Sequence, residues 1–204
     1  MRSELMMLIE ETAVADAALP VAQFKAHLRL GTGFAEDDVQ DEVLRSFLRA
    51  AIAAIEARTG KILISRQFSW TVYNWRDATG EVLPVVPVQM VTSVTLRDGG
   101  GQDTVLDPAA YRLERDSQRP RLRPAGALLP TVATGGAAIV ALVAGMAADW
   151  GGLPADLGQA VLLLAAHYYE YRHETALGDG CMPFGVTSLI QRYRTVRFGS
   201  GVVQ

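Results

Sequence analysis

Apolar residues recur at helical spacing in four stretches of the chain, which predict helices over residues 20–30, 36–59, 154–176 and 185–192. The second stretch has one apolar face, formed by Val39, Val43, Phe47, Ala51 and Ile55. The third is apolar around nearly its whole circumference, which is typical of a helix that lies buried inside a fold. We therefore expect the third helix to form the centre of a helical core.

Between residues 62 and 149 the pattern changes to the two-residue alternation of β-strands. The alternation is clearest at Phe68, Trp70 and Val72, and Asp98 with the three glycines after it is typical of a hairpin turn. Together these signals predict a small antiparallel β module, with strands over residues 68–75, 82–86, 88–96, 104–106, 111–114 and 139–143 and from residue 121 onward.

The predicted fold class is α+β, with three parts. A helical core takes residues 1–61 and 150–192, the β module is inserted as residues 62–149, and residues 193–204 form an extended tail that binds a partner. Residues 1–18 show no clear periodicity. Within the module, Pro84 and Pro87 indicate edge strands or strand starts, because proline cannot donate a hydrogen bond to a neighbouring strand.

One stretch of the sequence has to be tested as a membrane span, because no residue between Arg123 and Asp149 is charged. A spanning helix needs about 20 mostly apolar residues. Prolines and glycines interrupt this stretch, and its strongly apolar part is much shorter than that. A buried strand over residues 139–143 is the better interpretation, and we expect no contact with a membrane.

Length, net charge and cysteine content limit the kinds of protein that this chain can be. The 204 residues suit one compact domain or one domain with an insertion. The formal net charge of −3 disfavours a general nucleic-acid coat protein, which is usually strongly basic. Cys181 is the only cysteine, so no intramolecular disulfide can form, as is usual for proteins of the reducing cytosol.

The densest cluster of potential metal ligands is His167, Glu170, His173 and Glu174. Glu170 and His173 have the i, i+3 spacing of ferritin-like di-iron sites, which also need a second such pair. The chain contains no second Glu-x-x-His, so the polar, solvent-exposed end of the long helix is the better interpretation. We expect no metal and no cofactor.

Other candidate chemistry is equally incomplete. Cys181 lacks the local motif of a catalytic cysteine, and His27 lies beside Leu28 on a helix, where a packed or half-exposed side chain is expected. Residues 31–33, Gly-Thr-Gly, lack the third glycine of a dinucleotide-binding loop and follow a helix instead of a strand. We therefore expect a protein that is not an enzyme.

Two groups of arginines are candidates for contact with phosphates. The first surrounds the last predicted hairpin and consists of Arg112, Arg115, Arg119, Arg121 and Arg123, with Glu114 and Asp116 as partial counter-charges. The second lies near the C-terminus and consists of Arg192, Arg194 and Arg197. A solvated hairpin face is the more common meaning of the first group.

Several segments, in order along nearly the whole chain, resemble the phage head–tail connector (adaptor) proteins, and most closely the adaptor of a gene transfer agent. The resemblance rests on residues 24–30, 55–60, 83–94, 98–99, 106–107, 111–112, 144–145, 153–154, 167–172, 183 and 193–194. One departure is the Gly/Ala-rich stretch Ala125–Ala138, to which the resemblance gives no role.

The resemblance implies a structural protein that forms a dodecameric ring under the portal, lines the DNA channel and connects the head to the tail. Its partners would be the portal, neighbouring copies of itself, a stopper on the tail side, and packaged double-stranded DNA that passes without sequence-specific contact. It would assemble in the bacterial cytoplasm and remain at the head–tail interface of the particle.

In the resembling family the C-terminal segment makes most of the portal contact. The matching residues here are Tyr193, Arg194, Thr195, Val196, Arg197 and Phe198. A short extended segment can add a strand to a partner's sheet, with Val196 and Phe198 as the alternate apolar anchors. Arg119, Arg121 and Arg123 are the candidate contacts with DNA in the channel.

Three alternatives stay open. The nearest is another connector or head-completion protein, such as the stopper. A small DNA-binding module would use the arginine-rich hairpin. A carboxylate-metal enzyme would use Glu170 and His173.

Overall fold

The computed structural model describes residues 6–29, 38–172 and 182–194. The chain forms two compact units. The sheet unit takes the first residues up to Ala18 together with Ile62–Leu153, and the helical unit takes Leu19–Lys61 together with the residues from Pro154 onward. Helices and antiparallel sheets both contribute, which confirms the predicted α+β class.

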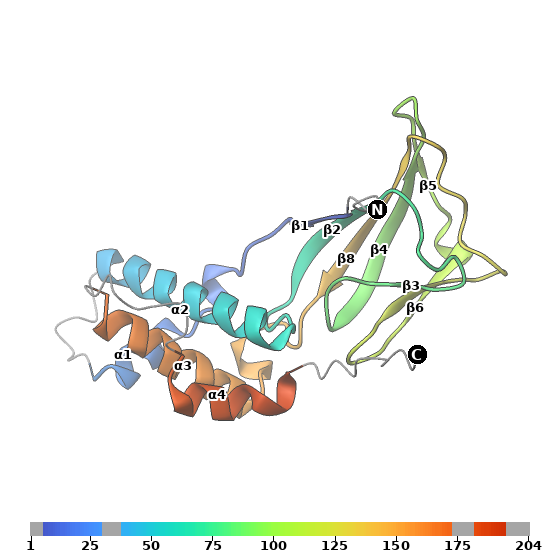
Figure 1. Cartoon of the computed structure of the whole chain (residues 1–204). Coiled ribbons are helices and arrows are strands. Elements are labelled where there is room, and N and C mark those ends of the chain that lie inside the picture. The colour runs from blue at the N-terminus through green and yellow to red at the C-terminus, as the bar shows by residue number, and fades with distance from the viewer. Residues whose placement is uncertain (1–5, 30–37, 173–181, 195–204) are drawn as a thin grey trace, which may run out of the picture. The chain divides into compact units, whose positions relative to one another are not determined.

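The helical unit consists, in its described part, of α1 (Val21–His27), α2 (Asp38–Thr59), α3 (Ala155–Glu170) and α4 (Phe184–Ile190) (Figure 1). Helix α3 packs against both α2 and α4. Its central position follows from its apolar circumference, since Leu157, Val161 and Leu164 are completely buried. The prediction that this helix is the centre of the helical part is consistent with these contacts.

Helix α2 presents a slightly different face to its neighbours than the sequence predicted. Leu44, Leu48 and Ile55 are completely buried, whereas Val43 is 43% exposed. Leu44 and Leu48, which lie beside the predicted face, are thus part of the buried face together with Ala51 and Ile55. The apolar stripe of this helix is wide, so residues one position beyond the predicted face are also apolar and can be buried.

Two predicted helix ends are wrong. The first helix stops at His27 instead of residue 30, and Arg29 adopts a left-handed φ of 55° that no helix interior allows. Helix α3 stops at Glu170 instead of residue 176. Arg172 there donates a hydrogen bond of 2.7 Å to the carbonyl of Tyr169, which satisfies a backbone acceptor that helix ends leave without a partner.

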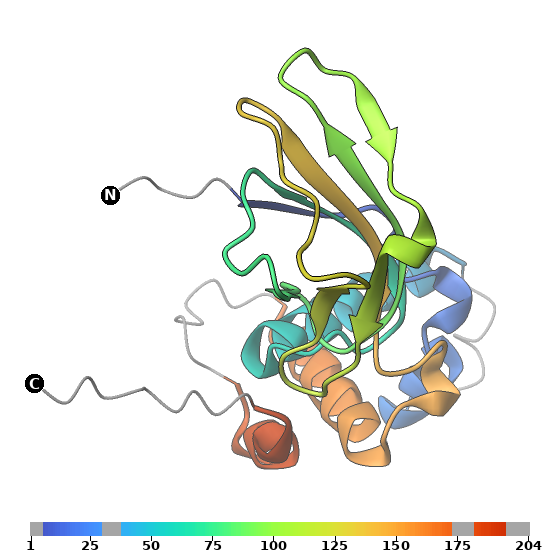
Figure 2. The ribbon, with the colours of Figure 1, turned by 90° about the vertical axis from the view of Figure 1, so that its right-hand side faces the viewer.

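The sheet unit contains a five-stranded antiparallel sheet in the order β1-β2-β8-β4-β5. A second, three-stranded antiparallel sheet has the order β3-β7-β6. The short strands β6 and β7 lie toward the viewer, in front of the long strands, in Figure 2. The bounds are β1 (Met6–Glu10), β2 (Arg66–Val72), β3 (Glu81–Val82), β4 (Val88–Arg97), β5 (Asp103–Val105), β6 (Tyr111–Glu114), β7 (Arg121–Pro124) and β8 (Ala137–Ala144).

One apolar cluster joins the two sheets. The five-stranded sheet contributes Trp70 and Leu142, and the three-stranded sheet contributes Tyr111 and Leu122. Trp70 and Leu122 are completely buried. The alternation along β2, noted in the sequence, places Phe68, Trp70 and Val72 on this covered side of the sheet.

Strand β1 was not predicted. It pairs with β2 from Met6 opposite Val72 to Glu10 opposite Phe68, and a 2.7 Å ion pair between Glu10 and Arg66 holds its end. Residues 6–18 therefore belong to the sheet unit and not to the helical core, and so do residues 150–153. All five residues of β1 are exposed, so the strand lacks the one-sided burial that produces a visible alternation.

The prolines act as strand boundaries. Strand β3 ends at Val82 instead of residue 86, two residues before Pro84, and β4 begins directly after Pro87. Pro87 thus marks a strand start, but β4 is not an edge strand, because it lies between β8 and β5. Strand β2 ends at Val72 and does not continue to residue 75.

The uncharged stretch tested as a membrane span contains strand β8, which confirms the predicted strand and extends it at both ends. Among the residues that the structure describes, none of the helices has both the length and the apolar character needed to cross a bilayer.

Candidate functional site

The predicted portal-binding tail begins at a hydrogen-bonded junction in the helical unit. The Tyr193 hydroxyl, in the 3₁₀ turn Gln191–Tyr193, donates a hydrogen bond of 2.8 Å to Oδ1 of Asp156. Arg192 Nε lies 2.8 Å from Oδ2 of the same carboxylate. Asp156 is in the first turn of α3, where a negative charge also interacts favourably with the helix dipole. The junction therefore holds Tyr193, the first residue of the predicted tail, against α3.

Burial and hydrogen bonds at this junction shift the pKa values of Asp156 and Tyr193. Partial burial, the largest single influence, raises the pKa of Asp156, but the hydrogen bonds from Tyr193 and Arg192 outweigh it and lower the pKa overall. Burial first, and then the hydrogen bond to Asp156, raises the pKa of Tyr193. Tyr193 therefore stays protonated and able to donate, while Asp156 stays ionised and able to accept.

The described residues include only part of the predicted portal-binding segment. Tyr193 is half-buried through its bond to Asp156, and Arg194 is exposed. Thr195, Val196, Arg197 and Phe198 lie outside the described residues. Sequence reasoning did not anticipate that Tyr193 bonds within its own chain, because a pair 37 residues apart gives no periodic signal.

The arginines of the last hairpin are largely engaged in the fold of the sheet unit. Arg123 Nε on β7 lies 2.7 Å from Oε2 of Glu114 on β6, and Arg121 lies 3.4 Å from Asp77. Arg115 donates a hydrogen bond of 2.9 Å to the carbonyl of Gln89. Because these guanidinium groups already bind partners within the protein, they are less able to bind phosphates.

The acids of this region are correspondingly stabilised in their charged form. The hydrogen bond from Arg123 lowers the pKa of Glu114. Hydrogen bonds from Thr79, and then the charges of Arg121 and Arg123, lower the pKa of Asp77. Both acids therefore remain ionised near neutral pH and continue to neutralise the arginines.

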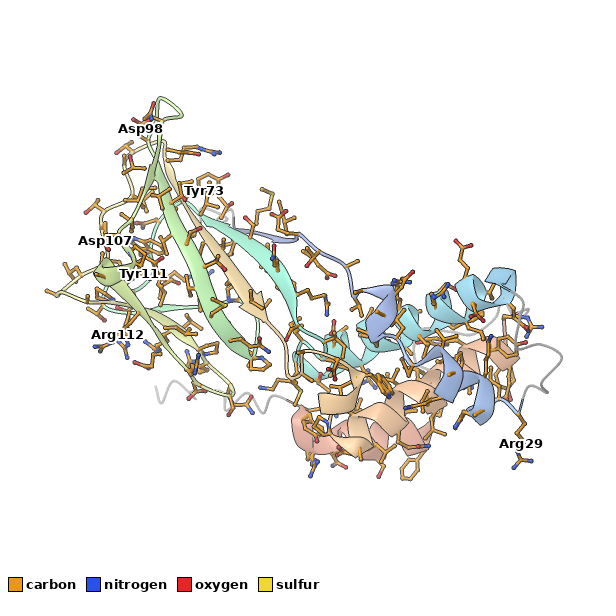
Figure 3. All side chains as sticks on the ribbon, turned by 180° about the vertical axis from the view of Figure 1, so that it is seen from behind. Arg29, Tyr73, Asp98, Asp107, Tyr111 and Arg112 are labelled. Carbon is orange, nitrogen blue, oxygen red and sulfur yellow. The ribbon has the colours of Figure 1, made fainter. Side chains whose placement is uncertain are left out.

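Two arginines of the group differ from the rest. Arg112 and Arg119 are exposed, and neither makes an ion pair within the described part of the chain. Figure 3 shows Arg112 on the outer side of β6. Arg119 borders a hollow of about 450 Å³, to which Arg76 and Arg121 also contribute. Of the three candidate DNA contacts, Arg119 is thus the one with an unneutralised head group.

The candidate metal ligands do not form a site within the described part of the chain. No three potential ligands there lie close enough together to hold a metal ion. Glu170 is exposed at the end of α3, and the His167 ring lies 4.7 Å from the Tyr171 ring. His173, Glu174 and Cys181 lie outside the described residues, as do Gly31, Thr32 and Gly33. His27 is the last residue of α1.

The sheet unit has a further surface, which sequence analysis missed. On the side of the five-stranded sheet opposite the apolar cluster, one cross-strand row consists of Met7, Thr71, Ile139, Thr95 and Val105. The two outermost members of the row are at least half exposed, and the three inner ones are partly exposed. None of the five carries a charge.

A second row lies beside the first and has the same character. It consists of Ile9, Ser69, Ala141 and Ser93, paired in that order across β1, β2, β8 and β4. These two rows are called the open face below. The signal for it was present in the sequence, since the members of both rows are methionine, aliphatic residues, serine or threonine at alternate positions of their strands, but the strand order is needed to bring them together.

Comparison with solved structures gives extensive matches. The chain is 52% identical to a chain in the neck of an empty GTA particle computed with C6 symmetry, with a TM-score of 0.85 over 96% of this chain and 98% of that one. A chain of the virion of a native gene transfer agent (GTA) particle is also 52% identical, with a TM-score of 0.82 and the same coverage. The chain belongs to the family of gene transfer agent structural proteins.

A third member of the GTA family, from the neck of a native particle computed with C12 symmetry, is 48% identical, with a TM-score of 0.81 over 96% of this chain and 98% of that one. The matches to these GTA proteins cover both the helical and the sheet unit. No family model matches the chain, and the search of curated proteins found no match.

Proposed function

We propose that this GTA structural protein is the adaptor, which forms a ring under the portal and connects the head to the tail. The observation that carries the proposal is its similarity, over 96% of its length, to chains from GTA necks computed with C6 and C12 symmetry. A twelve-fold ring between head and tail requires many identical copies with two different contact surfaces each. The chain's role is then structural, with no catalytic step.

The tail supplies the contact with the portal in this proposal. The junction of Tyr193, Asp156 and Arg192 fixes the first residue of the tail on α3. A segment that leaves from a fixed point reaches its partner at lower entropic cost than one with a free base. Residues 195–198 would then add a strand to a sheet of the portal, with Val196 and Phe198 as apolar anchors.

The ring would surround the packaged DNA without holding it tightly. Arg121 and Arg123 are paired with acids, and the formal net charge of the chain is −3. A channel lined with many free cations would retain DNA through its phosphates. Arg119 is the residue that we expect to approach the DNA most closely.

Removal of residues 195–204 tests the proposal. The truncated protein should fold normally but fail to bind the portal in a pull-down, and cells that produce it should accumulate DNA-filled heads without tails. Circular dichroism of the purified protein controls for the fold. Binding of portal by the truncated protein at full strength would show that the contact does not lie in the tail.

Point variants refine the same test. Phe198→Asp should be severe, because it places a charge in an apolar pocket of the partner, and Val196→Pro should be worse, because it also removes a backbone donor. Arg197→Ala should mainly change the salt dependence of binding. A stopper would instead bind the adaptor and not the portal, so pull-down by a purified portal also separates these two roles.

A further inference from the structure

The open face and the 125–136 loop are uncharged surfaces of the described part of the sheet unit, and the proposed function leaves both without a partner. The loop belongs to the Gly/Ala-rich stretch to which the sequence analysis gave no role. It connects β7 with β8 and contains no charged residue. Each surface needs an explanation, since exposed apolar side chains grouped on one surface commonly mark a contact site.

The loop is anchored near its middle by residues 129 and 130. Leu129 is buried in the apolar cluster between the sheets, and its backbone N–H donates a hydrogen bond of 2.8 Å to the carbonyl of Ala78. The Trp75 indole N–H donates a hydrogen bond, also of 2.8 Å, to the Pro130 carbonyl. The preceding residue, Leu128, is 61% exposed. The loop therefore presents one large apolar side chain from a fixed backbone.

The two surfaces lie on different sides of the sheet unit. The open face is the side of the five-stranded sheet that does not contact the apolar cluster. The loop leaves from β7 in the other, three-stranded sheet and extends outward beyond β6 before it returns to β8 (Figure 1). A ring of identical subunits needs this arrangement, because each copy must offer one surface to the neighbour ahead and a different surface to the neighbour behind.

The chemistry of the two surfaces is complementary. Neither carries a charge, so burying them against each other removes no ion from water. Leu128 can pack on Ile139 and Ala141 of the neighbouring copy. The hydroxyls of the open face, on Thr71, Thr95, Ser69 and Ser93, can form hydrogen bonds with exposed backbone groups of the loop. An ion pair of 2.7 Å between Arg97 and Asp103 follows at the end of the face.

We propose that the open face of each copy is covered by the 125–136 loop of the next copy in the ring, with Leu128 at the centre of the contact. The proposal rests on the proposed function, because it assumes that the copies form a ring, as the C6 and C12 symmetry of the matching necks supports. It adds the surfaces through which they meet.

The size of the contact explains how the ring would assemble. Five strands at about 4.8 Å spacing and about five residues of strand length give a face of roughly 19 by 17 Å. This is about 320 Å², well below the roughly 800 Å² per partner of a stable interface. The isolated protein should therefore be monomeric, and rings should form when the portal holds many copies close together.

Cysteine cross-linking in assembled particles tests the contact. Leu128→Cys and Ser93→Cys are combined in a background in which Cys181→Ser removes the natural thiol. Both positions are solvent-accessible, and Ser→Cys conserves size, so folding should be unaffected. A short bis-maleimide should then produce a ladder of covalent multimers that extends beyond the dimer, whereas each single variant should produce none. Ser69→Cys, in the same row as Ser93, provides a second position on the face.

Three results would overturn the proposal. The Ser93→Cys variant alone could yield dimers, which would show that the open face pairs with its own copy. Both double variants could fail to cross-link in particles that contain the protein. Ser93→Cys in intact particles could react with a small maleimide as fast as in the isolated chain, which would show that the face stays uncovered. If the unmodified protein is absent from the neck, the proposed function fails instead, and immunoblotting of purified particles distinguishes that case.

Discussion

The helical unit and the sheet unit bury their apolar residues in different ways. Helix α3 packs against both α2 and α4, and residues such as Leu48 and Leu164 are completely buried. The five-stranded sheet is covered on one side only, where Trp70 lies in the cluster between the sheets, and its other side remains open. In the described part of the helical unit the helices bury their apolar side chains against each other, whereas the sheet unit keeps one uncovered side that a partner can bind.

This difference indicates which residues determine stability and which determine assembly. Substitutions in the helical interior should lower stability through cavities, and substitutions on the open face should change assembly while stability is preserved. The covered side of the sheet should behave like the helical interior although it shares its strands with the open face. Variants that separate these effects test the comparison.

The largest loss of stability should follow Trp70→Ala. The side chain is completely buried, so its removal should cost about 3–5 kcal/mol of unfolding free energy. Its indole N–H has no hydrogen-bond partner among the described residues, so Trp70→Phe removes an unsatisfied donor along with part of the volume. Chemical denaturation should therefore show a much smaller loss for Trp70→Phe than for Trp70→Ala. Equal losses would mean that the packing at this position is not what stabilises the sheet unit.

Leu164→Ala should lower the unfolding free energy by about 2–5 kcal/mol, because Leu164 is completely buried in the helical unit. The matched control is Leu163→Ala on the same helix, where the side chain is partly exposed and the loss should be clearly smaller. Thermal melts of the two variants give the comparison. If the control loses as much as Leu164→Ala, α3 is not packed as described.

Tyr193→Phe should have a modest effect on stability, about 1 kcal/mol, because it removes a partly exposed hydroxyl that donates to Asp156 and accepts from Arg192. The affinity for the portal should fall several-fold although the protein stays folded, since the base of the tail is no longer fixed. Tyr169→Phe is the control, because that ring contacts Phe47 and Arg172 without a hydrogen bond from its hydroxyl to any described residue. Unchanged portal binding by Tyr193→Phe would remove the junction from the docking model.

The smallest effect should follow the double change Glu170→Ala with His173→Ala. Glu170 is exposed at the end of α3. His173 lies outside the described residues, and the sequence predicts a polar, solvent-exposed segment there. Particle yield and melting temperature should stay nearly unchanged. A particle defect in a protein that melts normally would revive the metal-site hypothesis, and elemental analysis of the purified protein would then identify the metal.

The sequence predicted elements whose periodicity is produced by their own burial. The alternation at Phe68, Trp70 and Val72 and the stripe of α2 follow from one covered side each, and both predictions located the right segments. Strand β1 was missed because exposed residues leave no such trace. The end of α3 was placed too late because the apolar and aromatic composition continues past Glu170, whereas the hydrogen bond from Arg172 to the Tyr169 carbonyl at the helix end has no signature in the sequence.

The candidate sites were predictable to a lesser degree. The arginine group was visible in the sequence, but its neutralisation was only partly so, because Asp77 meets Arg121 from 44 residues away. The open face needed the strand order, which places Met7, Thr71 and Ile139 in one row although they are far apart in the chain. Long-range pairing of this kind has no local signature.

The central claim is that this chain forms the ring between head and tail, and labelled electron microscopy tests it most directly. A compact tag is inserted after Gly101, in the exposed β4–β5 hairpin near Asp98 (Figure 3), and the neck of assembled particles is reconstructed. The account predicts twelve tag densities in one ring between the portal and the tail. Tag density elsewhere in the particle, or a neck without it, would contradict the account.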